Sequence, residues 1–265
     1  MTALRVARVT LSLCRRRWAP VVGVIILLSV LARWGLPSRS VMPTNVWDVE
    51  FGVLDTPFSV MVLLPMLYAV SSLDAATNDL RQWRAWPLLR VSHRSAWWAG
   101  KLLATVGMMV AYIGLLTGIP LGVAAVTEPW SIKWSSAALR APTLASALLA
   151  HTYHSPLAAL GANLLLLGPG FVALGCCLLT LTLFAREDLA GAVAGAMSIA
   201  AYALWVWAPA RGVWIPPYQW LLLAHNPVDV KVPTWFTSWS SLGLDLGWAS
   251  LSVTLATWRL SRMML

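Results

Sequence analysis

The chain has 265 residues, of which 59% are hydrophobic and only 11% are charged, and its mean hydropathy is +0.72. Soluble domains carry about 25% charged residues, so this composition excludes a soluble enzyme and a disordered protein and favours a membrane protein. The net charge of +9 does not indicate nucleic-acid binding, because the basic residues form short clusters at the ends of apolar segments. The 17 tryptophans agree with a membrane setting, since indole is enriched at the lipid–water boundary.

Residues 1–17 are too basic to cross a membrane and lack a convincing signal-peptide cleavage pattern. On a helical wheel Arg5, Arg8, Arg15 and Arg16 gather on one side, and Leu4, Ala7, Leu11 and Cys14 lie on the adjoining side. This pattern predicts an amphipathic helix that lies in the inner membrane interface, with its basic side toward anionic headgroups. The alternative is a plain helical extension of the first membrane span.

Six later segments are apolar and long enough to cross about 30 Å of hydrocarbon as helices. They are residues 18–36, 57–73, 97–123, 157–184, 189–208 and 239–258. We therefore predict an all-α polytopic membrane protein, a single transmembrane domain over 1–265 with six transmembrane helices and short loops. No loop is long enough to form an independent catalytic domain, so function is expected in the spans or in a partner.

The distribution of Lys and Arg between the connections predicts the orientation. If the N-terminus lies inside, thirteen of the nineteen Lys and Arg fall in cytoplasmic segments and six fall outside. Such an excess on the inner side is typical of membrane proteins. Both termini are therefore expected in the cytoplasm of a multi-pass protein of the plasma membrane.

Residue patterns for catalysis or metal binding are weak. The nearest P-loop candidate, Gly100-Lys101-Leu102, lacks the first glycine and the hydroxyl that phosphate and magnesium need. His151 and His154 form an H-x-x-H without further ligands nearby in the sequence, whereas a metal site needs three or four. We expect no catalytic residue, no metal and no cofactor in this chain.

Two polar residues in the predicted spans are candidates for a translocation path, Asn163 and Asp245. A carboxylate in a span is costly and is expected to face protein or water rather than lipid. Asp245 lies six residues from Trp239, so a hydrated position near the outer boundary is the alternative to a functional one.

The connection 74–96 is predicted to be a cytoplasmic coupling loop. Asn78 or Asp79 can cap a short helix, with Arg81 and Arg84 on one side of it, and Pro87 ends it. A short basic helix held between two spans is a plausible docking element for a cytoplasmic partner. The alternative is an ordinary basic loop on the inner side.

At this loop the sequence resembles the membrane (permease) subunits of type-2 ATP-binding-cassette (ABC) exporters. The resemblance rests on Asp79-Leu80-Arg81, on the stretch from Leu88 to Arg94 (LLRVSHR) and on Gly100-Lys101-Leu102-Leu103. The family's Gly-Thr after the acidic stretch is absent, and Ala85-Trp86-Pro87 stands there. In the family a segment before the last span often re-enters the outer leaflet, as 214–224 would here.

The resemblance implies a mechanism with partners. Two permease chains, identical or different, would pair and bind a separate cytoplasmic nucleotide-binding subunit, which holds ATP and magnesium. The residues implied to contact that ATPase are Asp79, Arg81, Trp83, Arg84, Arg90, Arg186, Glu187 and Asp188. The chain would form the translocation path of a bacterial exporter, and its substrate is not indicated.

Two other classes of protein fit the composition. One is a secondary carrier that works without an ATPase, which would need polar residues converging in the middle of the membrane. The other is a polytopic membrane enzyme or scaffold, for which the sequence offers no catalytic cluster.

Overall fold

The computed structural model describes residues 3–37, 42–82, 94–140, 144–185, 187–220, 225 and 235–262, without the side chains of 13–17, 74–82, 94–95, 145, 187–188 and 218. Over these residues the chain is helical and contains no strand, as predicted. The elements are α1 (Ala3–Trp34), α2 (Val46–Leu54), the π-helical turn η1 (Ser59–Leu63), α3 (Leu64–Gln82), α5 (Arg94–Thr127), α6 (Ser136–Arg140), α7 (Ala145–Thr152), α8 (Pro156–Phe184), α9 (Glu187–Trp207), α10 (Pro209–Gly212), α11 (Pro216–Gln219) and α12 (Ser238–Arg262).

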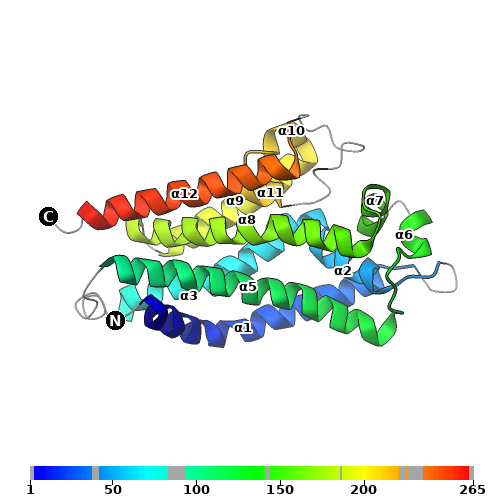
Figure 1. The fold of residues 1–265 in the computed structure, drawn as a ribbon, viewed down its shortest axis with the longest axis horizontal. Coiled ribbons are helices and arrows are strands. Elements are labelled where there is room, and N and C mark those ends of the chain that lie inside the picture. Colours follow the sequence, from blue (N-terminus) through cyan, green and yellow to red (C-terminus); the bar gives the residue numbers. More distant parts are fainter. Residues whose placement is uncertain are drawn as a thin grey trace.

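The long helices run side by side along the molecule (Figure 1). The two chain termini, the end of α3, the start of α5 and the turn from α8 to α9 lie together at one end, which we call the terminus end. Helices α2, α6, α7 and α10 lie at the opposite end, which we call the cap end. The bundle therefore has two different ends, joined by helices that extend from one to the other.

Three helices are long and apolar enough to cross a membrane within the described part of the chain: Ala96–Thr127, Pro156–Phe184 and Leu189–Trp207. A fourth span is formed if Val46–Leu54 and Ser59–Leu73 are counted together, although the two meet at an angle of 51°. The predicted first and last spans are helical, but α1 contributes only the shorter apolar stretch Trp18–Trp34 and α12 does not meet this test. Length and composition thus support three or four of the six predicted spans.

The N-terminal segment is continuous with the first long helix, since α1 runs from Ala3 to Trp34 with Pro20 inside it. The helix predicted for residues 1–17 is present from Ala3, and its position in the inner membrane interface stays a prediction. Val6 is buried there among Trp97, Leu179 and Ala256, on α5, α8 and α12. The segment therefore packs against the other helices through apolar side chains.

Helix α1 packs closely on α5 at Gly100. A Cβ atom at this position would lie 2.6 Å from Val6 Cβ and 2.7 Å from the Ala3 carbonyl oxygen. Only glycine leaves room for the backbone of α1 at this distance. Gly100 therefore lets the terminus end of the bundle close tightly.

A row of buried aromatic rings joins the helices through the middle of the bundle. Trp18 lies 6.5 Å from Tyr112, and Tyr112 lies 5.4 Å from Tyr68, between ring centroids. Phe171 lies 5.0 Å from both tyrosines and 5.1 Å from Trp220. Such aromatic pairs contribute about 0.5–1.5 kcal/mol each beyond the area that they bury, and this row connects α1, α3, α5, α8 and the residue after α11.

Replacing Gly100 by Val should lower the free energy of unfolding by about 1–3 kcal/mol, because the new side chain would overlap α1. Thermal unfolding of the purified protein in detergent measures this effect. Gly114→Val on the same helix is the matched control, because nothing lies within 4 Å of a Cβ there, and it should change stability by less than about 0.5 kcal/mol. Equal losses in both variants would contradict the close packing of α1 on α5.

Candidate functional site

Four of the eight residues expected to contact an ATPase lie on helix ends at the terminus end. Asp79 and Arg81 are on the last turns of α3, and Glu187 and Asp188 are on the first turn of α9, but none of these four side chains is among those described. The remaining expected contacts, Trp83, Arg84, Arg90 and Arg186, lie outside the described residues. Figure 1 shows that the ends of both segments reach the same end of the bundle.

The predicted second span, 57–73, has a helix before it that the sequence interpretation did not include. Helix α2 precedes the span, ends at Leu54 and meets the following helical segment at 51°. Pro57 disfavours a helical conformation at the residue before it, and this accounts for the break. The π-helical turn η1 ends at Leu63, two residues before Pro65, and this proline removes a donor from the helical hydrogen-bond ladder. The sequence at Asn45 carried a signal for α2, because Asn45 and Asp48 form a capping box.

Polar side chains from neighbouring helices satisfy carbonyl groups near the break. Asn163 on α8 donates from Nδ2 to the Leu54 carbonyl oxygen at 3.3 Å. The Tyr112 hydroxyl on α5 donates to the Leu64 carbonyl oxygen at 2.9 Å. Asn163 was predicted to line a translocation path. In the structure its side chain is fully buried, and its hydrogen bond links α8 to the end of α2.

Asp245, the other predicted path residue, is fully buried on α12. The hydrated boundary position left open by the sequence is therefore not what the structure has. Its Oδ1 atom accepts a hydrogen bond from Trp220 Nε1 at 3.3 Å. Trp220 follows α11 directly and packs on Gly170 of α8, where a Cβ atom would overlap the indole ring. The segment predicted to re-enter the membrane, 214–224, thus turns back into the bundle through Trp220, and 221–224 lie outside the described residues.

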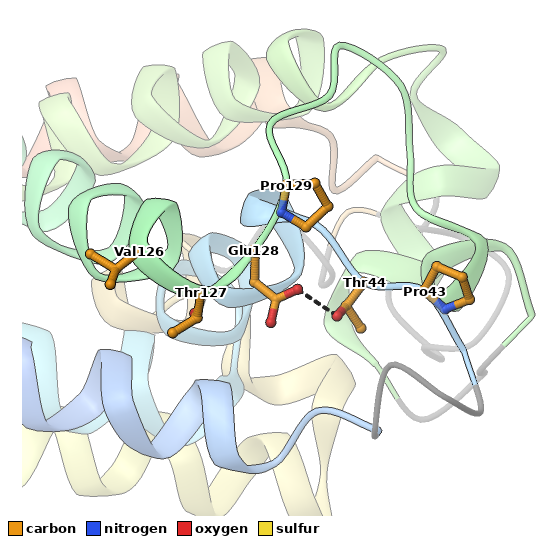
Figure 2. Close-up of a pocket in the computed structure, with 6 residues that line it drawn as sticks. All are labelled: Pro43, Thr44, Val126, Thr127, Glu128 and Pro129. Atoms are coloured by element: carbon orange, nitrogen blue, oxygen red, sulfur yellow. Dashed lines mark hydrogen bonds between the residues drawn. The ribbon is translucent and has the colours of Figure 1, made fainter.

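A polar network at the cap end was not predicted from the sequence. Glu128, directly after α5, accepts a hydrogen bond from Thr44 Oγ1 at 2.7 Å (Figure 2) and lies 2.5 Å from Arg33 Nε of α1. Asp48 of α2 accepts from Ser146 Oγ of α7 at 2.7 Å. These contacts join four segments that are far apart in the chain, and they hold α2 in place.

A pocket opens beside this network. It has a volume of about 380 Å³ and is lined by Pro43, Thr44, Val126, Thr127, Glu128 and Pro129 (Figure 2). The Glu128 side chain is fully buried, because its carboxylate points toward Thr44 and Arg33. The pocket therefore offers a ligand mostly backbone, threonine and apolar groups.

The two histidines of the H-x-x-H pattern are exposed, His151 at the end of α7 and His154 just after it. No group of three or more His, Cys, Asp or Glu that could hold a metal ion occurs among the residues that the structure describes.

Comparison of the chain with protein-family models, with curated proteins and with solved structures finds no match. The resemblance of the 79–103 stretch to exporter permeases therefore stays a hypothesis, and the function must be argued from the residues and the geometry.

The contact between Gly170 and Trp220 can be tested by a double-mutant cycle. Gly170→Ala should lower the free energy of unfolding by about 1–3 kcal/mol, because it displaces the indole and its hydrogen bond to Asp245. In a Trp220→Leu background the same change should cost less than about 0.5 kcal/mol, since the smaller side chain leaves room.

Gly161→Ala on α8 is the control, because nothing lies within 4 Å of a Cβ there, and alanine favours a helix. Additive losses in the cycle would show that Trp220 is not seated on Gly170.

Proposed function

We propose that this chain is the membrane-spanning permease subunit of an ABC exporter, with six spans, that works with a separate cytoplasmic ATPase. The observation that carries the proposal is the arrangement of the terminus end. The end of α3, the start of α5, the end of α8 and the start of α9 share that end of the bundle with the start of α1 and the end of α12 (Figure 1), and the sequence carries clusters of basic residues in 1–17 and 74–101. A cytoplasmic ATPase that binds at this end would contact both of the expected segments at once.

In this proposal the subunit converts the motion of the ATPase into movement of substrate across the membrane. Closure of a pair of ATPase subunits would push on the α3–α5 connection, and α3 and α5 would carry the displacement along the bundle. The cap end would respond, since α5 ends at Thr127, directly before Glu128, and α3 continues from the broken helix. ATP and magnesium would be bound by the partner, and a second permease chain would complete the path.

A secondary carrier without an ATPase is the second candidate, and one observation favours it. The break between α2 and α3 places irregular backbone and buried polar groups inside an apolar bundle, as in many ion-coupled carriers. Transport by the purified chain alone in vesicles, without nucleotide, would favour this candidate over the exporter subunit.

The proposed orientation, with both termini in the cytoplasm of a bacterial cell, predicts the accessibility of single cysteines in a chain whose native cysteines are replaced. Ser92→Cys should resist a membrane-impermeant maleimide added to intact cells, because its loop faces inward. Lys133→Cys, exposed near the cap end, should react. Mass shift on gels measures both, and the opposite result would invert the topology.

The proposed docking role predicts that Arg81→Glu with Arg84→Glu lowers recovery of an ATPase partner by about tenfold, which corresponds to about 1.4 kcal/mol of binding free energy. The reversed charges would weaken the binding of this basic segment to the ATPase. Co-purification of the tagged permease with a co-expressed candidate ATPase that carries a P-loop measures the effect.

Arg140→Glu, at the exposed end of α6, is the matched control and should leave recovery unchanged. Unchanged recovery and ATP turnover in the double reversal would count against this docking surface.

A further inference from the structure

Two glutamates are fully buried at the cap end, and their surroundings differ. Glu128 has a cation and a hydroxyl, Arg33 and Thr44, at its carboxylate. Glu50, in the middle of α2, has no hydrogen-bond partner at either carboxylate oxygen among the residues that the structure describes. The negative charge of Glu128 is therefore balanced by Arg33, whereas a charge on Glu50 would have no partner among the described residues.

Among the residues that the structure describes, Glu50 forms no ion pair. Helix α2 packs against α1, α5, α7 and η1. The described basic groups that these elements and their flanking loops contribute at this end are Arg33, Lys133, His151 and His154. Arg33 is bound to Glu128, and the other three are exposed.

The other titratable groups near α2 add negative charge or are neutral. Asp48 lies on the same helix and is held by hydrogen bonds, and Asp55 follows the helix directly. Burial, together with the charge of Asp55, raises the pKa of Tyr153, so this phenol remains neutral. The amide of Asn163 is bound to the Leu54 carbonyl one turn beyond Glu50.

An ionised carboxylate without a partner in an apolar interior costs far more than a neutral carboxylic acid, and such groups neutralise instead. We propose that Glu50 is a proton-binding site, which takes up one proton from water to become a neutral carboxylic acid when α2 is packed into the bundle. Water must reach the carboxyl group for the proton to leave again. Proton release is therefore linked to movement of α2 out of the cap end, whether an ATPase or an ion gradient drives the chain.

Carbodiimide labelling tests the proposal on the purified chain in lipid nanodiscs, without any partner. Dicyclohexylcarbodiimide reacts with protonated carboxyl groups in apolar surroundings, and peptide mass spectrometry locates the product. We expect modification of Glu50 at pH 6, a loss of that modification in Glu50→Gln, and no modification of Glu128, which is paired with Arg33. Absence of label on Glu50, or equal labelling of Glu128, would overturn the proposal.

Thermal stability against pH gives a second measurement that does not depend on reagent access. A proton held only by the folded state makes stability fall as pH rises. The wild-type melting temperature should therefore decline between pH 5 and 8, and Glu50→Gln, which keeps the shape of the neutral acid, should decline less steeply, by the contribution of one proton. Glu128→Gln should keep the wild-type pH slope but unfold at a lower temperature throughout.

Two outcomes would contradict proton binding at Glu50. One is the same pH slope in Glu50→Gln and in the wild type. The other is a rise of the wild-type midpoint when sodium replaces choline at pH 8, absent from Glu50→Gln, because this would assign the carboxylate to a metal cation instead. Both results are independent of whether the chain binds an ATPase.

Discussion

The fold depends on one constraint, which is that every backbone polar group freed inside an apolar bundle must find a partner within the protein. The break between α2 and α3 frees such groups in a helical segment that would otherwise satisfy them all. Asn163 and Tyr112 donate to carbonyl groups on either side of it, from α8 and α5. The broken helix is therefore tied to two of the most apolar long helices, and a shift of either would reach it.

The two ends of the bundle follow different chemistry. At the terminus end apolar side chains such as Val6 and Trp97 pack closely where Gly100 allows contact. At the cap end buried carboxylates are held by hydroxyl groups and by Arg33, across segments distant in the sequence. An end held by a few directional contacts can rearrange as a unit when one of them breaks, whereas a close-packed apolar end moves as a rigid body. This contrast suits a subunit driven at one end that opens at the other.

Sequence reasoning located the long helices because their apolar runs are continuous. The predicted span 157–184 begins one residue after α8 and ends with it, and 189–208 overlaps nearly all of α9. Helix α2 escaped prediction because its three nearby acids, Asp48, Glu50 and Asp55, are typical of a loop. Asp48 is held by a hydrogen bond from Ser146, which lies 98 positions away, and no local pattern contains such a contact. For the same reason the position of Asp245 followed only from Trp220, 25 residues before it.

The row of rings from Trp18 to Trp220 has a consequence for how the two halves of the chain fit together. Trp18 belongs to the first helix and Trp220 to the late segment that turns back toward α8. The first helix and this late segment are thus connected indirectly, through the rings of Tyr112 and Phe171. Trp220 belongs to the last fifth of the chain. During synthesis the earlier helices can therefore complete their packing around Phe171 only after that part has been made.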